Sequence, residues 1–211
     1  MSLEDTRREY QYDFLTRESL KKCPIDQFSN WMNDALKANL SDPSAMSLAT
    51  VNADGQSWQR TVLLKNFDKN GFIFYTNLGS RKALDIKNNS NVSLLFPWFD
   101  LDRQVIIGGK AELIPKKESA AYFKKRPRKS QIGAWTSMQS KVIPSRKILE
   151  DEFYNLDKKY ADSDIPVPDF WGGYRIAPRE IEFWQGGKNR LHDRFKYVLT
   201  SKEWKVSRLS P

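Results

Sequence analysis

The chain has 211 residues, and its 35 Lys and Arg against 26 Asp and Glu give a formal net charge of +9. This length suits one domain, and the charge favours an anionic partner: nucleic acid, a membrane surface or a small phosphorylated molecule. The single cysteine, Cys23, excludes an intramolecular disulfide and any multi-cysteine zinc site.

The N-terminal segment is charged and weakly patterned, so we expect a mobile arm over residues 1–20 and a single domain over residues 21–211. Its opening residues, MSLEDTRREY, lack the apolar stretch that a signal peptide needs. The longest apolar run, VSLLFPWF at 92–99, is too short to cross a bilayer. The sequence therefore predicts a reduced, cytoplasmic protein with no membrane partner.

The first regular element is an amphipathic helix over residues 24–40. Phe28, Trp31, Met32 and Leu36 recur at helical spacing, and Pro24 is a typical first-turn residue.

A dense β region follows this helix. Five segments have the composition and alternation of strands: 45–51, 57–67, 72–78, 91–99 and 103–114. Asp54-Gly55 and Asn70-Gly71 are hairpin turn signals, and a short helical pattern occupies 80–89. Hairpin connections indicate an antiparallel sheet, and so many consecutive strands indicate that it curls into a barrel.

Helical patterns return at 116–125, 127–137 and 145–160, and three terminal strands are expected at 172–184, 193–200 and 204–209. The predicted fold class is mainly β with flanking helices.

Most familiar catalytic motifs are absent. The chain has no G-x-G-x-x-G, no phosphate-binding loop, no G-x-S-x-G and only one histidine, so a transition-metal site is not expected.

Two groups of cationic and hydroxyl residues stand at element ends. NLGSRKA places Ser80, Arg81 and Lys82 at a helix start, where free N–H groups and positive charge suit an anion, although an ordinary serine cap with solvated basic residues is an alternative. The predicted strand QRTVLLK places Arg60, Val62 and Leu64 on one face and Thr61, Leu63 and Lys65 on the other.

The second group lies in AAYFKKRPRKSQIGAW. Tyr122 and Arg126 are four residues apart on one helical face, Pro127 ends that helix and begins another, and Ser130 falls in the new first turn. A phenol, a guanidinium and a hydroxyl suit a phosphate monoester. The alternative is that KKRPRK is a nucleic-acid or surface patch.

The only histidine lies in KNRLHDRF at 188–195. If this segment is a strand, Arg190, His192 and Arg194 share one face, with Leu191 and Asp193 on the other. Two neighbouring guanidinium charges would then favour neutral His192 near pH 7. A solvated edge strand with an inert histidine is the alternative.

Ten short strings in one order carry a resemblance to a known family. They are RREY, RTVLLK, FYTNLGSRKA, SLLFPW, RQV, YFKKRPRKSQIGAW, MQS, FWGGYR, EFWQGG and RLHDRF. Together they resemble the pyridoxamine 5'-phosphate oxidase family from about residue 7 to the terminal RLSP.

The resemblance implies an FMN-binding split β-barrel that works as a homodimer with FMN at the subunit interface. It implies oxidation of pyridoxamine 5'-phosphate or pyridoxine 5'-phosphate by oxygen to pyridoxal 5'-phosphate and hydrogen peroxide, by hydride transfer from the substrate 4'-carbon to the flavin. The residues that match the family's FMN contacts are Arg60, Thr61, Val62, Leu63, Leu64, Lys65, Tyr75, Thr76, Arg81, Lys82, Gln104, Gln139, Ser140, Trp184 and Arg194.

The substrate residues implied by the resemblance form three sets. Lys65, Tyr122, Arg126 and Ser130 match a cradle for the substrate phosphate. Arg190 and His192 match catalytic positions near the reacting end, with Leu191 between them. The residues that match an arm over the substrate are Arg7, Arg8, Glu9 and Tyr10.

Three alternatives remain open at this point, one of which is a structural barrel that binds no flavin. A flavin reductase-like protein of the same barrel class would share the FMN motifs but lack the substrate residues. A nucleic-acid-binding protein would explain the net charge of +9.

Overall fold

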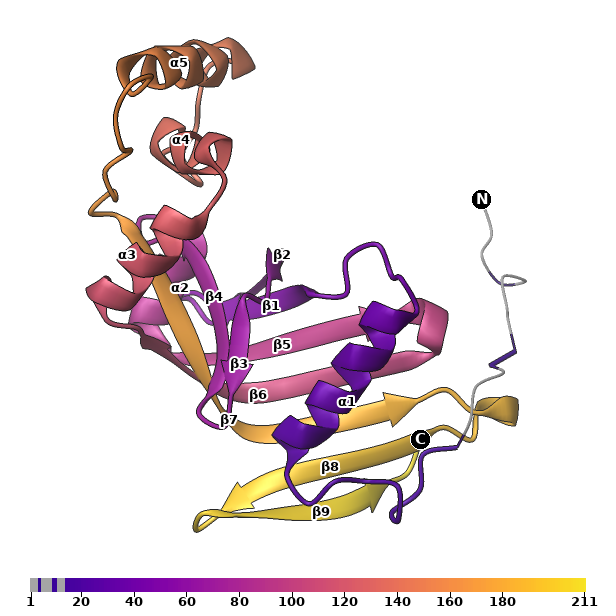
Figure 1. The fold of residues 1–211 in the computed structure, drawn as a ribbon. Helices are drawn as coiled ribbons and strands as arrows, with labels where there is room; N and C mark the ends of the chain where they lie inside the picture. The colour runs from indigo at the N-terminus through magenta and orange to yellow at the C-terminus, as the bar shows by residue number, and fades with distance from the viewer. Residues whose placement is uncertain (1–3, 5–8, 11–13) are drawn as a thin grey trace.

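We analysed a computed structural model of the 211-residue chain, which describes residue 4, residues 9 and 10, and residues 14–211. Within these residues, nine strands form one antiparallel sheet with the order β2-β1-β5-β6-β7-β4-β3, and β8 and β9 extend it beyond β7 (Figure 1). The strands are β1 (Ala45–Val51), β2 (Ser57–Leu63), β3 (Asn66–Asp68), β4 (Gly71–Asn77), β5 (Asn91–Trp98), β6 (Arg103–Leu113), β7 (Trp171–Gln185), β8 (Asp193–Thr200) and β9 (Glu203–Leu209).

The sheet curls because its two ends are neighbours in the chain. β2 and β3 lie at opposite ends of the strand order, yet only Leu64 and Lys65 connect them. The backbone N–H of Lys65 donates to the carbonyl oxygen of Ile73 at 2.8 Å, which ties the connection to β4. The predicted single strand over 57–67 is therefore two strands, while the predicted barrel-like curvature is confirmed.

Both predicted hairpin turns are present. Gly55 and Gly71 have φ angles of +82° and +135°, in the region that favours glycine. A Cβ at position 71 would lie 2.1 Å from the carbonyl oxygen of Ile176, so glycine is also required there by the close approach of β7.

The helix α1 (Pro24–Lys37) crosses one face of the sheet, as Figure 1 shows. Its buried residues include Phe28, Trp31 and Met32, and the Phe28 ring meets those of Phe72 and Phe96 at centroid distances of 4.9 and 5.0 Å. The predicted amphipathic helix is confirmed and covers the main core, but it ends at Lys37 instead of residue 40, and Leu36 is 55% exposed.

The other helices gather at one end of the molecule (Figure 1). They are α2 (Arg81–Asn88), α3 (Lys116–Lys125), α4 (Arg128–Thr136) and α5 (Arg146–Lys159). Phe123, Ile132, Leu156 and Ile165 form a second, smaller core among α3, α4, α5 and the loop after them. This core fixes α3 and α4 beside β4 and β7.

The described part of the N-terminal arm touches the sheet. The N–H of Leu15 donates to Oδ2 of Asp193 at 3.0 Å, and the Leu15 side chain is buried. Arg7 and Arg8 lie outside the described residues, and the mobility of the arm stays a prediction.

Candidate active site

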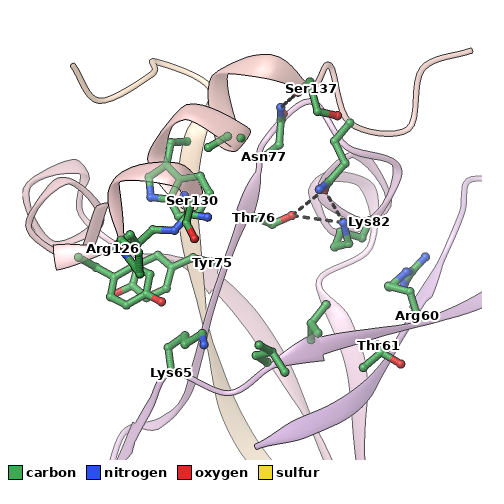
Figure 2. Close-up of a pocket in the computed structure, with 18 of the residues that line it drawn as sticks. Arg60, Thr61, Lys65, Tyr75, Thr76, Asn77, Lys82, Arg126, Ser130 and Ser137 are labelled. Carbon is green, nitrogen blue, oxygen red and sulfur yellow. Dashed lines mark hydrogen bonds between the residues drawn. The ribbon is translucent and has the colours of Figure 1, made fainter. Parts of the chain in front are cut away.

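Both predicted anion sites open into one cleft of about 850 Å³ between β2, β4, α2 and the junction of α3 with α4 (Figure 2). The predicted residues that line it are Arg60, Thr61, Val62, Leu63, Lys65, Tyr75, Thr76, Lys82, Tyr122, Arg126, Ser130 and Gln139. Leu64 does not line it, because its side chain is buried in the main core.

One wall of the cleft is a cluster of hydroxyl, amide and cationic groups around Lys82. The Lys82 Nζ donates to Oε1 of Gln139 at 2.7 Å and to the hydroxyl oxygens of Thr76 and Ser80 at 3.3 and 3.4 Å. Thr76 belongs to β4 and Gln139 to the loop after α4, so three distant segments meet here. The cluster holds the ammonium group in place at the start of α2.

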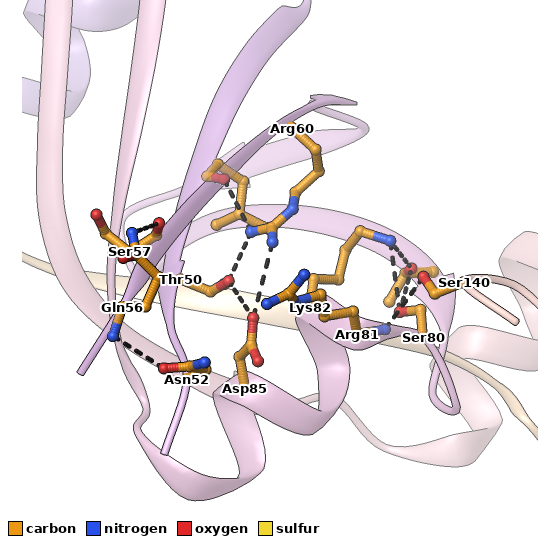
Figure 3. A network of polar contacts seen from close by, with 12 residues as sticks. Thr50, Asn52, Gln56, Ser57, Arg60, Ser80, Arg81, Lys82, Asp85 and Ser140 are labelled. Atoms are coloured by element: carbon orange, nitrogen blue, oxygen red, sulfur yellow. Dashed lines mark hydrogen bonds and ion pairs between the residues drawn. The ribbon is translucent and has the colours of Figure 1, made fainter. Parts of the chain in front are cut away.

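Arg81 and Ser140 border this cluster (Figure 3). The backbone N–H of Arg81, at the first turn of α2, donates to the Ser140 hydroxyl at 3.2 Å. The guanidinium carbon of Arg81 lies 3.7 Å from the centre of the Trp58 ring, a cation–π contact. Ser80 stands at the N-cap of α2 but makes no side-chain capping bond, so the serine-cap half of the alternative explanation is wrong. Arg81 is exposed, as the solvated basic residues of that alternative would be.

The cations of this wall are poorly neutralised. Burial and the neighbouring charge of Arg60 lower the pKa of Lys82 to about 8. The pKa of Arg60 is itself lowered by burial and by Arg81, although Asp85 opposes this. Desolvated positive charges that repel one another gain most from an anion, so this wall suits a phosphate group.

The second wall is an aromatic stack beneath Arg126. The rings of Tyr75 and Tyr122 are parallel with centroids 3.9 Å apart, and the Trp171 ring lies parallel to Tyr75 at 6.2 Å. The guanidinium carbon of Arg126 lies 4.3 Å from the Trp171 ring centre. Burial lowers the pKa of Arg126 and raises that of Tyr122.

This wall contains hydrogen-bond donors without acceptors. Among the described residues, Arg126 Nη1 and Trp171 Nε1 are buried and have no hydrogen-bond partner. Ser130 is in the first turn of α4, where its N–H bonds to the Pro127 carbonyl oxygen at 2.8 Å. A buried cationic donor normally has a partner, so an anionic ligand is the simplest complement for Arg126.

A further group of predicted residues lies elsewhere on the chain. The Trp184 ring contacts those of His192 and Tyr10, with centroids 4.7 and 5.6 Å apart. Trp184, Tyr10 and Gln104 line a separate hollow of about 290 Å³. We call these residues, with Arg190 and Arg194, the β7–β8 group.

One chain does not unite the β7–β8 group with the cleft. Tyr75 is opposite Gly173 on β7, whereas Trp184 lies near the other end of the same strand. Trp184 comes eleven positions after Gly173 along β7, roughly 36 Å at about 3.3 Å per residue if the strand were straight. The two sets of predicted contacts therefore stand at different ends of β7 (Figure 1).

The predicted row of Arg190, His192 and Arg194 on one strand face is wrong. Lys188–Arg190 is a short 3-10 turn in which Asn189 and Arg190 have φ angles of 55° and 63°, and β8 begins only at Asp193. Arg190 is exposed, and Leu191 is 72% exposed while Asp193 is buried. Arg194 is on β8, where Nε donates to Oε1 of Glu182 at 2.8 Å.

The pKa of His192 is lowered, as predicted, but the main cause is burial and not the neighbouring arginines. Burial lowers the pKa of His192, and Arg190 lowers it further. Its Nδ1 accepts a hydrogen bond from the N–H of Gly187 at 3.1 Å. The proton of neutral His192 is then on Nε2, which makes Nε2 a donor.

Several residues at or behind these walls were missed by sequence reasoning, among them Thr50, Trp58, Asp85 and Trp171. Thr50 could have been found, because Met46, Leu48 and Thr50 alternate along β1 and all three are buried. A hydroxyl on the buried face of a strand needs a partner. Asp85 and the two tryptophans have no comparable sequence signal.

No helix among the described residues is long and apolar enough to span a membrane. Neither do three or more His, Cys, Asp or Glu side chains of these residues gather as they would around a metal ion.

Comparison with known proteins gives consistent matches. A family model described as "Pyridoxamine 5'-phosphate oxidase" matches residues 32–159, and one described as "Pyridoxine 5'-phosphate oxidase C-terminal dimerisation region" matches residues 171–211. Proteins named pyridoxine/pyridoxamine 5'-phosphate oxidase from Vibrio vulnificus (strain YJ016) and Hahella chejuensis are 55% and 53% identical, each with 100% of both chains covered.

Solved structures share the fold. PhzG from Burkholderia lata 383, in complex with tetrahydrophenazine-1-carboxylic acid, has a TM-score of 0.90 at 27% identity, with 97% of this chain and 100% of that chain covered. A pyridoxamine 5'-phosphate oxidase-related, FMN-binding protein from Nostoc punctiforme has a TM-score of 0.71 at 15% identity, covering 91% and 100% of the two chains. The second likeness concerns the fold alone.

Proposed function

Since the chain belongs to the pyridoxamine 5'-phosphate oxidase family, we propose that it oxidises pyridoxamine 5'-phosphate or pyridoxine 5'-phosphate to pyridoxal 5'-phosphate. Oxygen is the electron acceptor and hydrogen peroxide a product, and the amine substrate also releases ammonia. The observation that carries this proposal is a single cleft with two separate cationic walls, one for each of two phosphate groups.

The wall around Lys82 fits the phosphate of FMN. Arg60, Lys82 and the Thr76 hydroxyl line the cleft there, and Arg81 and Ser140 border them. Lys82 and Arg60 are desolvated, so a bound phosphate would restore the interactions that burial removes. When bound, FMN supplies the hydride acceptor and transfers the electrons to oxygen.

The wall around Arg126 fits the phosphate of the substrate. Arg126 Nη1 is a buried donor without a partner among the described residues, and Tyr122 and Ser130 add two hydroxyl groups in the same cleft. Lys65 lies in this cleft below Tyr75 and is placed to add a further charge (Figure 2). This wall distinguishes the proposal from a flavin reductase-like function, which needs no second phosphate site.

We further propose that the active unit is a homodimer with FMN at the subunit interface. The β7–β8 group lies far along β7 from the cleft, and its members Trp184, His192 and Arg194 fall within residues 171–211, the segment that matches a dimerisation region. A second copy would bring its own Gln104, Trp184 and Arg194 to the first copy's cleft. This arrangement explains why the predicted FMN contacts form two separate sets in one chain.

The catalytic roles assigned to Arg190 and His192 are proposals about alignment. Hydride transfer from the 4'-carbon needs the substrate ring held close to the flavin, and the guanidinium of Arg190 can press on that ring. Neutral His192, with its proton on Nε2, can donate a hydrogen bond to a polar group of the substrate. Leu191 supplies an apolar side chain between them.

The arm residues Arg7, Arg8, Glu9 and Tyr10 are proposed to cover the bound substrate. Tyr10 supports this role, because its ring makes a T-shaped contact with the His192 ring at a centroid distance of 5.2 Å. Covering the substrate would exclude water from the site of hydride transfer.

The experiment is a turnover assay on protein reconstituted with FMN. Adding pyridoxamine 5'-phosphate or pyridoxine 5'-phosphate should consume oxygen and form hydrogen peroxide and pyridoxal 5'-phosphate, while unphosphorylated pyridoxamine should react poorly. Protein that holds FMN but leaves both phosphorylated vitamers unchanged would favour the flavin reductase-like alternative. A colourless protein with salt-dependent nucleic-acid binding would favour the other.

A further inference from the structure

We propose that Asp85, acting through Thr50, is a positioning residue that aims Arg60 at the phosphate of the flavin. This inference rests on the proposed FMN site and assigns a role to two residues outside the cleft. Neither Asp85 nor Thr50 lines the cleft, whereas Arg60 does.

A buried relay connects the three side chains (Figure 3). Arg60 Nη1 donates to the Thr50 hydroxyl oxygen at 2.6 Å, and that hydroxyl donates to Oδ2 of Asp85 at 2.7 Å. Arg60 Nη2 lies 3.7 Å from the same carboxylate oxygen. Thr50 is fully buried and Asp85 is 5% exposed, so water does not compete for these bonds.

The carboxylate determines the direction of the relay. A threonine hydroxyl has one proton, and when Asp85 accepts it, only oxygen lone pairs face Arg60. The Leu48 carbonyl oxygen accepts a second bond from Arg60 Nη1 at 3.1 Å. Nη1 is thus fixed on β1, and the other guanidinium donors are oriented relative to it.

Charge gives Asp85 a second effect on the same arginine. Arg60 shares its neighbourhood with Arg81 and Lys82, two like charges. Among the described residues, Asp85 is the one carboxylate that forms an ion pair with any of these three cations. Without it, repulsion would favour rotamers that move the Arg60 guanidinium away from the cluster.

The competing explanation is that the relay merely ties β1, β2 and α2 together. A structural tie would support the whole flavin site, including the surfaces that contact the ring system. A positioning role affects only the contact with the phosphate. The two explanations therefore predict different effects on the binding of riboflavin, which has the same ring system without the phosphate.

The test measures dissociation constants of the apoprotein for FMN and riboflavin by quenching of flavin fluorescence. Asp85→Asn should weaken FMN binding about tenfold, since a charge-assisted contact to the phosphate is misaligned, and should leave riboflavin binding within about twofold. Thr50→Val, which removes the hydroxyl, should do the same. Thr50→Ser keeps the hydroxyl and should restore FMN binding.

Asp68→Asn is the matched control. It removes the nearer of two carboxylate partners of Arg175, in an ion pair between β3 and β7. The Arg175 side chain is 21% exposed, against 20% for Arg60. Its FMN and riboflavin binding should equal those of the wild type. If Asp85→Asn is insoluble, Thr50→Val compared with Thr50→Ser decides the question.

Two results would overturn the inference alone: equal loss of FMN and riboflavin binding, or unchanged FMN binding in both Asp85→Asn and Thr50→Val. A wild-type protein that binds neither flavin would instead overturn the proposed cofactor, and this inference with it.

Discussion

Arg126→Ala should remove substrate-phosphate binding while leaving the flavin in place. The Arg126 guanidinium lines the cleft next to Tyr122, and its Nη1 has no acceptor among the described residues. In the substrate complex that donor would gain a charged acceptor. The cations that we assign to FMN are different ones: Arg60, Arg81 and Lys82.

The magnitude follows from that one unpaired donor. A hydrogen bond between charged groups contributes about 1.5 to 3 kcal/mol, so losing it should lower kcat/KM by about 10-fold to 150-fold. The apoprotein should lose little stability, because the lost cation–π contact with Trp171 contributes about 0.5 to 1 kcal/mol at a partly exposed site and the variant no longer buries a charge.

The assay combines steady-state kinetics with pyridoxamine 5'-phosphate and flavin content measured by absorbance. Arg128→Ala is the matched control, because Arg128 Nη2 donates to the carbonyl oxygens of Tyr160 and Asp157 at 2.8 and 3.3 Å and so supports α5 instead of the cleft. It should lower the melting temperature with little effect on KM. Equal loss of flavin in Arg126→Ala, or an equal rise of KM in Arg128→Ala, would refute the assignment.

Three further outcomes are expected. FMN affinity should fall as the pH rises through about 8, where Lys82 loses its proton, whereas the Lys82→Arg variant should keep its FMN affinity up to about pH 9.5. The stability of the apoprotein should change in the opposite direction. Because folding lowers the pKa of Lys82 from 10.5 to about 8, the free energy of unfolding should rise between pH 8 and 10.5. In stopped-flow reduction of bound flavin by pyridoxamine 5'-phosphate, Arg190→Met should be slower than His192→Asn, because Arg190 positions the substrate ring while neutral His192 only donates a hydrogen bond from Nε2. A larger defect in His192→Asn, on the order of 100-fold or more, would show that His192 is a general base. Light scattering on the holoprotein should give about twice 24.6 kDa, and a monomer with full FMN occupancy would exclude the interface site.

Local sequence signals predicted the cleft well. Tyr122, Arg126 and Ser130 meet because Pro127 ends one helix and starts the next, a rule that acts over a few residues. Alternation along β2 likewise predicted which side chains turn inward, with Arg60 and Val62 partly buried between exposed neighbours. Such signals depend on backbone geometry that each segment largely determines for itself.

The errors arose where tertiary contacts override local preference. KNRLHDRF alternates like a strand, but the chain turns at Asn189 and Arg190, and the strand starts at the buried Asp193, whose carboxylate accepts bonds from Leu15 and Arg208. Both partners lie outside the segment KNRLHDRF, so the alternation of its residues could not reveal them. Asp85 was missed for the same reason, because a carboxylate in a short polar helix looks solvent-exposed until Thr50 and Arg60 are placed beside it.

The central claim is that this chain holds FMN next to a phosphorylated vitamer and transfers hydride between them. It is tested most directly by the absorption spectrum of the purified, FMN-loaded protein before and after adding pyridoxamine 5'-phosphate without oxygen. The account predicts that the visible flavin band disappears and returns when oxygen is admitted. A flavin band that persists unchanged at saturating pyridoxamine 5'-phosphate would contradict it.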